Sequence, residues 1–293
     1  MRHVLAIGMW LIASLAWPQG PMTLTHVHGL AYSADGERLM IPSHHGLAMY
    51  EGGRWSKAPG PAHDYMGFAA TARHLYSSGH PAPGSGLVNP FGLMRSRDGG
   101  KSWDKLGLEG ETDFHLLAAS WNTNTIYVWN PAPSSRIREP GLHATKDEGA
   151  TWRKARAAGI HGDPIALAVH PDDPALVALG TSEGVFQSAD GAASFQEIGS
   201  RGAGTAVLYD LDAQHLWFAG HDGKAARLAR AKLRGGPAAE IKLPPLPNDA
   251  VAYIAQNPVK RSEYAIATFE RSVLISADAG RTWRRIASRG KGH

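Results

Sequence analysis

Residues 96–103 read Ser96-Arg97-Asp98-Gly99-Gly100-Lys101-Ser102-Trp103, and the chain contains three further copies of this octapeptide. Two are close copies, Thr145-Lys146-Asp147-Glu148-Gly149-Ala150-Thr151-Trp152 and Ser276-Ala277-Asp278-Ala279-Gly280-Arg281-Thr282-Trp283. The third is weaker, with Ala at the glycine position and Phe at the tryptophan position: Ser188-Ala189-Asp190-Gly191-Ala192-Ala193-Ser194-Phe195. The shared pattern is Ser/Thr-x-Asp-x-Gly-x-Ser/Thr-Trp.

These residue types predict a hairpin turn. Aspartate accepts hydrogen bonds from the backbone of its own turn, and glycine supplies a positive φ. The tryptophan then gives each turn a large apolar anchor. We therefore expect a structural role for the aspartates and tryptophans of the repeat, which are Asp98, Trp103, Asp147, Trp152, Asp190, Asp278 and Trp283.

The spacing of the copies predicts the architecture. They begin at residues 96, 145, 188 and 276, so the intervals are 49, 43 and 88, and the last is two steps of about 44. A period of about 44 residues is usual for a four-stranded propeller blade. Degenerate copies fit at Tyr50-Glu51-Gly52-Gly53-Arg54-Trp55 and near residue 232. The sequence thus predicts an all-β fold, a β-propeller with six four-stranded antiparallel blades, and favours six blades over seven.

The composition agrees with many strands and turns, since 34 Gly and 19 Pro lie among short apolar runs. There is no cysteine, so burial of a core must supply the stability. The net charge of +4 comes from scattered basic residues, and we expect no nucleic-acid partner. We also expect no nucleotide cofactor, and a monomer.

The N-terminus has the features of a secretory signal peptide. Arg2 precedes an apolar run from Val4 to Ala16 that ends in small residues. We expect a signal peptide at residues 1–16, a secreted or periplasmic mature chain, and a single propeller domain over residues 17–293. The apolar run is short for a membrane span, and nothing later in the sequence supplies one.

The closure of the ring stays open at this point. Blade one is expected to start with a strand over residues 26–32, and blade six to end near Trp283, each with four strands of its own. The ring then closes by packing alone, unless Met22-Thr23-Leu24 or the tail after Trp283 adds a strand across the seam. From about residue 285 we expect the basic tail to fray.

The repeated octapeptide resembles the Asp-box, or BNR repeat, of sialidases, sortilin-type receptors and many exported bacterial β-propellers. The whole chain resembles small exported BNR-repeat proteins, called glycosyl-hydrolase-like or sortilin-like, that carry motifs such as His-x-His-Gly-Leu and Asp-Tyr-Met-Gly. The resemblance implies that the boxes join the third and fourth strands of each blade and face away from the binding site, so we give them no catalytic role. The opposite side is called the loop face below.

If the boxes lie on one side of the ring, many histidines fall on the opposite side, the loop face. Imidazole groups with a few carboxylates suit a transition metal, and a thioether from Met66 would favour copper over zinc. The first candidates come from one blade, where His26 and His28 are two residues apart and His44 and His45 follow the adjacent strand. The next candidates are His63, His80 and His115. The alternative is that these histidines form hydrogen bonds with the backbone around a water-filled channel.

Two other functions remain open. A glycoside hydrolase needs a carboxylate pair, or a tyrosine nucleophile as in sialidases. The loop-face candidates are Asp64, Asp113, Asp163, Asp249, Glu270 and Tyr65. Blade one lacks the Arg-Ile-Pro type motif of sialidases, so the resemblance covers the scaffold and not the site. A non-catalytic scaffold that binds a glycan or a protein would use the same rim. The leading prediction is an exported binding protein that holds copper or zinc.

Overall fold

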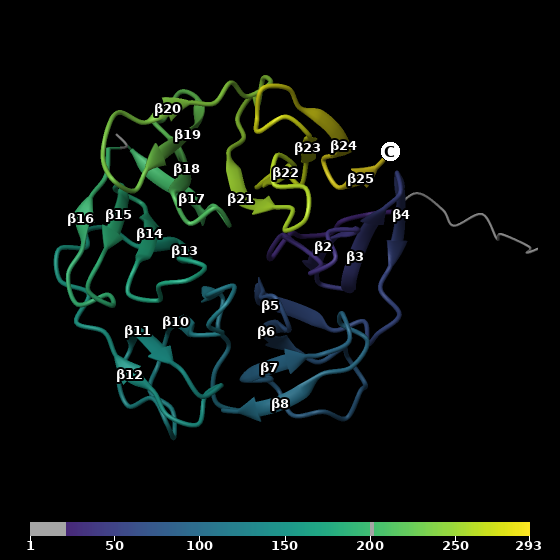
Figure 1. Cartoon of the computed structure of the whole chain (residues 1–293). Helices are drawn as coiled ribbons and strands as arrows, with labels where there is room; N and C mark the ends of the chain where they lie inside the picture. Colours follow the sequence, from purple (N-terminus) through teal and green to yellow (C-terminus); the bar gives the residue numbers. More distant parts are fainter. Residues whose placement is uncertain (1–21, 200–201) are drawn as a thin grey trace, which may run out of the picture.

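Six antiparallel sheets form a ring in the computed structural model, which describes residues 22–199 and 202–293 (Figure 1). The predicted all-β, six-bladed propeller is therefore confirmed. These two ranges contain no helix, and so none that could cross a bilayer. The expected signal peptide at residues 1–16 lies outside the described residues.

Each blade is a meander, and its strands run from the axis outward. Blade 1 holds β1 (Ala31–Tyr32), β2 (Arg38–Ser43), β3 (Gly46–Glu51) and β4 (Arg54–Lys57). Blades 2 and 3 hold β5 (Asp64–Ala70), β6 (Leu75–His80), β7 (Leu93–Ser96), β8 (Asp104–Gly107), β9 (Leu117–Ala119), β10 (Ile126–Asn130), β11 (Gly141–Thr145) and β12 (Arg153–Lys154). Blades 4 and 5 hold β13 (Pro164–Val169), β14 (Val177–Thr181), β15 (Val185–Ser188), β16 (Gln196–Glu197), β17 (Ala203–Tyr209), β18 (His215–His221), β19 (Ala226–Lys232) and β20 (Ala239–Glu240). Blade 6 has five strands, β21 (Val251–Gln256), β22 (Tyr264–Thr268), β23 (Val273–Ser276), β24 (Arg284–Ser288) and β25 (Lys291–Gly292).

The repeated octapeptides form the turns between the third and fourth strands of four blades. In the first copy, the N–H groups of Lys101 and Ser102 donate to Asp98 Oδ1 at 3.1 and 3.0 Å, and the Ser102 hydroxyl donates to Oδ2 at 2.6 Å. Ser96 Oγ joins the same network, because it donates to Asp98 and accepts from Gly100 N–H. Asp147, Asp190 and Asp278 accept the matching hydrogen bonds in the other copies.

The core is divided into apolar clusters between neighbouring blades. Trp103 packs into the cluster shared by blades 1 and 2, Trp152 into that of blades 2 and 3, and Trp283 into that of blades 5 and 6. Phe195 of the weaker copy fills the same place between blades 3 and 4. Each octapeptide thus anchors its own blade to the preceding one by burying an aromatic ring.

The ring is closed by both chain ends, and the expectation of a frayed tail is wrong. The N–H of Leu24 donates to Gly290 O at 2.7 Å, and the N–H of Gly292 donates to Met22 O at 2.9 Å. Trp55 Nε1 of blade 1 also donates to Ile286 O at 3.0 Å. Residues after 285 stay ordered because they pair with residues 22–24 and carry the seam of the ring.

The entry into blade 1 also differs from the expectation. A strand was expected over residues 26–32, but only Ala31–Tyr32 is a strand. Residues 26–30 approach β1 without ladder pairing, apart from a hydrogen bond of 3.1 Å from His28 N–H to Pro42 O. The side chains of this segment are therefore free of a regular pleat.

Candidate metal centre

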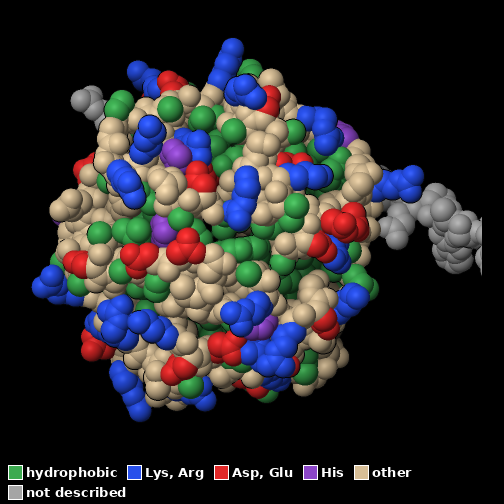
Figure 2. Space-filling model, viewed as in Figure 1, with side chains coloured by type: hydrophobic (Ala, Val, Ile, Leu, Met, Phe, Trp, Pro, Cys, Tyr) green, Lys and Arg blue, Asp and Glu red, His purple; other side chains and the backbone are tan. Residues whose placement is uncertain are grey.

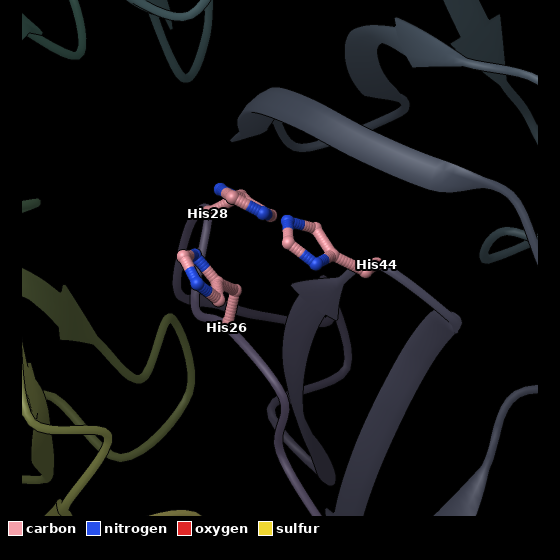
Figure 3. A group of neighbouring side chains, drawn as sticks. All are labelled: His26, His28 and His44. Carbon is pink, nitrogen blue, oxygen red and sulfur yellow. The ribbon is translucent and has the colours of Figure 1, made fainter.

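Three histidine side chains converge on the loop face of blade 1. His26, His28 and His44 each offer a ring nitrogen, and these nitrogens all lie within 4.8 Å of one another. The ring centroids of His26 and His44 are 4.3 Å apart, and those of His28 and His44 are 4.8 Å apart. Figure 3 shows the three rings facing one another above the start of blade 1.

Two short segments position these rings. His26 and His28 come from the segment that enters β1. His44 comes from the turn between β2 and β3, which Gly46 closes with a φ of 94°. The next residue, His45, is exposed, and its ring stands edge-on to His44 at 6.5 Å. His45 is therefore not part of the group.

The least exposed member of the group is His28, whose side chain is 12% exposed. Burial, together with the neighbouring His44 and His26, lowers the pKa of His28 to about 4. Its Nε2 atom is buried and has no hydrogen-bond partner. A neutral imidazole is the form that ligates a metal, so His28 needs to lose no proton at neutral pH.

Asp64 adds a carboxylate to the three imidazoles. Its Oδ1 lies 3.6 Å from His28 Nε2, and its Oδ2 lies 3.8 Å from His44 Nε2. Oδ1 is buried and accepts no hydrogen bond within the described structure. The sequence suggested Asp64 only as a hydrolase residue. Its position at the start of β5, opposite His80 in the ladder, was the available signal for a place beside the histidines.

A second group lies across blades 2 and 3. Asp113 Oδ2 is 3.0 Å from His80 Nε2 and 2.8 Å from His115 Nε2. Burial acts to raise the pKa of Asp113, but the contacts with His115 and His80 outweigh it and hold this pKa below its usual value. The same contact raises the pKa of His115.

The other predicted ligands have different surroundings. His63 Nδ1 accepts a hydrogen bond of 3.0 Å from Ala82 N–H, and its ring packs edge-on against Phe91 at 4.9 Å. Burial lowers the pKa of His63. Met66 is buried within β5. His63 therefore supports the loop after β6.

Among the carboxylates considered for hydrolysis, Asp64 and Asp113 lie beside the histidines, whereas Asp163 and Asp249 have other surroundings. Asp163 is exposed at the start of blade 4. Asp249 Oδ1 accepts hydrogen bonds from the N–H groups of Ala250 and Glu270 at 2.8 and 3.0 Å, which holds a turn of blade 6. Tyr65 is fully buried, donates to Pro61 O at 3.0 Å, and has a pKa raised by burial.

A further group of two aspartates and a histidine is already paired with an arginine. Asp210, Asp212 and His215 lie close enough together to share an ion. However, Arg230 Nε donates to Asp210 Oδ2 at 2.8 Å, and the Tyr264 hydroxyl donates to Asp210 Oδ1 at 2.7 Å. The guanidinium fills the place of a metal, so this group ties blade 5 to blade 6.

The axis of the ring holds a cavity of about 180 Å³. Its walls are mainly apolar side chains of the innermost strands, such as Leu30, Leu167 and Tyr253, and His28 and His115 also line it. On the face seen in Figure 2, hydrophobic side chains show toward the middle, and charged side chains of both signs surround them. His28 of the first group and His115 of the second thus border the axial cavity.

Comparison with known proteins supports the fold. No protein-family model matches the chain, and no curated protein matches it. Among solved structures, it is similar to a GH74 enzyme of Niastella koreensis, with a TM-score of 0.62 and 15% identity over 92% of this chain and 46% of that one. A GH74 xyloglucanase of Xanthomonas campestris gives 0.59 and 16% over 92% and 46%. YCF48 bound to D1 peptide gives 0.51 and 17% over 93% and 85%.

The chain therefore spans about half the length of the two GH74 structures, at 46% of each. At identities of 15–17% these likenesses concern the fold and not the site. They agree that the chain is a β-propeller.

Proposed function

We propose that this chain is an exported β-propeller binding protein of the Asp-box type whose loop face holds a transition metal ion, copper or zinc. The observation that carries the proposal is the convergence of His26, His28 and His44, whose ring nitrogens lie within 4.8 Å of one another. The exported location rests on the expected signal peptide at residues 1–16. The Asp-box assignment rests on the four octapeptides and their shared hydrogen bonds.

The donor set favours borderline metals. Three imidazole nitrogens and one carboxylate, that of Asp64, suit Zn²⁺ or Cu²⁺ better than Mg²⁺ or Ca²⁺, which prefer oxygen ligands. Two buried atoms at this place, His28 Nε2 and Asp64 Oδ1, have no hydrogen-bond partner. Leaving buried polar atoms unpaired is costly, and a metal ion between them would remove that cost.

The test is metal content measured by mass spectrometry on untagged mature protein from cells grown with added copper and zinc. We expect stoichiometric metal in the wild-type chain, and loss of one equivalent in the His26→Ala/His44→Ala variant. His161→Ala is the matched control, because His161 is an exposed histidine of blade 4. Wild-type protein without metal above background, or a double variant that keeps all of its metal, would contradict the proposal.

A peptide or protein ligand at the same face is the second candidate. It is favoured by the likeness to YCF48 bound to D1 peptide, of which the chain covers 85%, and to a chain of a nidogen/laminin complex, of which it covers 91%. Such a ligand predicts binding that survives both chelation and the His26→Ala/His44→Ala variant. Pull-down from periplasmic extract with wild-type and variant protein separates the two candidates.

A glycoside hydrolase is the weaker alternative. The GH74 likeness favours it, but a general acid needs a carboxyl group whose pKa is raised. The pKa of Asp113 is instead held low by two histidines, and Tyr65 is fully buried. Turnover of a glycoside that survives chelators and is lost on Asp113→Asn would restore this alternative.

A further inference from the structure

The group formed by His80, Asp113 and His115 is separate from the three imidazoles of blade 1. Among the described loop-face histidines, only His26, His28 and His44 have ring nitrogens within 4.8 Å of one another. One ion bound there therefore leaves His80 and His115 without a role. Yet both of these imidazoles contact one carboxylate oxygen, at 3.0 and 2.8 Å.

The carboxylate of Asp113 lacks ordinary hydrogen bonds. Its side chain is only 12% exposed, and both oxygens are buried without a hydrogen-bond partner. The ring nitrogens of His80 and His115 lie 3.0 and 2.8 Å from its Oδ2 atom. A buried carboxylate needs a positive charge beside it to offset desolvation, and here a protonated imidazole or a metal ion supplies that charge.

The neighbouring amide gives His80 a defined tautomer. Its Nδ1 lies 2.7 Å from Asn89 Oδ1, and an amide oxygen can only accept, so Nδ1 carries the hydrogen. In the neutral ring, Nε2 then presents its lone pair to the lone pairs of Asp113 at 3.0 Å. Such a contact is repulsive unless a cation lies between the two atoms. That cation is a proton on His80 or a metal ion.

We propose that a second transition metal ion binds at His80, Asp113 and His115. Two imidazole nitrogens and a carboxylate oxygen form an N/O donor set of the kind that holds Zn²⁺ or Cu²⁺. The side chains of His80 and His115 are 40% and 64% exposed, so both rings can turn toward an ion that binds beside Asp113. Loading the site displaces the proton that His80 or His115 shares with Asp113 in the metal-free protein.

The two positions border one basin. His115 and Asp113 both act electrostatically on His28, which belongs to the first group. His28 and His115 also line the same axial cavity. The second position rests on the proposed function, because it assumes that this basin takes up metal. The two positions nevertheless use different ligands, so they can fail separately.

The test is a titration of the metal-free full chain with Cu²⁺ alone, with bound copper counted after desalting. We expect two equivalents in the wild-type chain and one in His80→Ala/His115→Ala. We also expect one equivalent in His26→Ala/His44→Ala. Asp113→Asn, which keeps the shape of the side chain, should also bind one. The electron paramagnetic resonance spectrum of the fully loaded wild-type chain should be broadened by a neighbouring copper, and that broadening should vanish in each variant.

The outcomes separate the two claims. One equivalent in the wild-type chain that persists in His80→Ala/His115→Ala and is lost in His26→Ala/His44→Ala overturns the second position and leaves the proposed function intact. The opposite pattern overturns the first site and keeps the second. No bound copper overturns both. Thermal unfolding of each variant checks that it remains folded.

Discussion

Aspartates on the two faces of this propeller have opposite surroundings. On the box face, Asp98 accepts hydrogen bonds from donors within four residues along the chain. On the loop face, Asp64 and Asp113 have oxygens without a hydrogen-bond partner, and ring nitrogens of His28 and His115 lie 3.6 and 2.8 Å from these carboxylates. The hydrogen bonds of Asp98 stabilise a turn, whereas the carboxylates of Asp64 and Asp113 keep charge and lone pairs available for a ligand.

The comparison explains why the two faces carry different roles. The box aspartates are fully satisfied by their own turn, so they have no capacity left for chemistry. The loop-face carboxylates are incompletely satisfied by the protein, and unpaired buried groups of this kind persist at functional sites. Changes on the box face should therefore alter stability, and changes on the loop face should alter metal binding.

The largest loss of folding stability should come from removing the tryptophan of a box. Trp103 packs between blades 1 and 2, and its ring lies 5.0 Å from that of Tyr65. Trp103→Ala should lower the free energy of unfolding by about 3 kcal/mol, because it leaves a cavity at a blade interface. Urea denaturation measures this loss. Metal content should stay at the wild-type level, and a parallel loss of metal would contradict the separation of the two faces.

A smaller loss of folding stability should come from replacing the aspartate of a box. The local hydrogen bonds, first that of Ser102, lower the pKa of Asp98 to about 2 from 3.8. A depressed pKa contributes stability above pH 3.8 that is lost as the pH falls toward 2. Asp98→Asn should therefore cost about 1 kcal/mol at neutral pH, since Asp98 is exposed to solvent, and should flatten the acid limb of the stability curve.

Asp64→Asn is the matched change on the other face. It should leave neutral-pH stability within about 0.5 kcal/mol of wild type, since no local turn depends on it. It should weaken metal affinity about 10- to 100-fold, whether Asp64 ligates the ion or orients His28 and His44. Denaturation curves from pH 2 to 7 and metal titrations on both variants measure the contrast. Equal changes in stability and in metal affinity for Asp98→Asn and Asp64→Asn would contradict the contrast between the two faces.

The same contrast accounts for what the sequence could predict. The box turns are local, so their spacing predicted the blade count and the strands they join. The proximity of His26 and His28 to His44 could also be predicted, because β2 and the turn that carries His44 follow His28 closely in the sequence. Closure of the ring depends on Leu24 meeting Gly290, and no local pattern specifies that pairing. The choice of His44 over His45 depends on the orientation of one turn, and the contact of Asp113 with His80 depends on how blades 2 and 3 meet.

The last contrast concerns backbone conformation within the boxes. The residue after the box aspartate has a positive φ in all four copies, 75° at Gly99, 56° at Glu148, 71° at Gly191 and 58° at Ala279. Only glycine adopts this conformation without a steric cost. Ala279→Gly should therefore stabilise the protein by about 0.5 kcal/mol, since relief of the backbone exceeds the loss of a partly buried methyl group.

Gly99→Ala is the reverse change at the same position of another box. No atom lies within 4 Å of a Cβ added there, so the substitution tests the backbone alone. It should destabilise the protein by about 1 kcal/mol, because the methyl group gains no contact to offset the strain. Thermal unfolding of the two variants should give shifts of opposite sign. Shifts of the same sign would mean that packing around Ala279, and not the left-handed turn, governs this position.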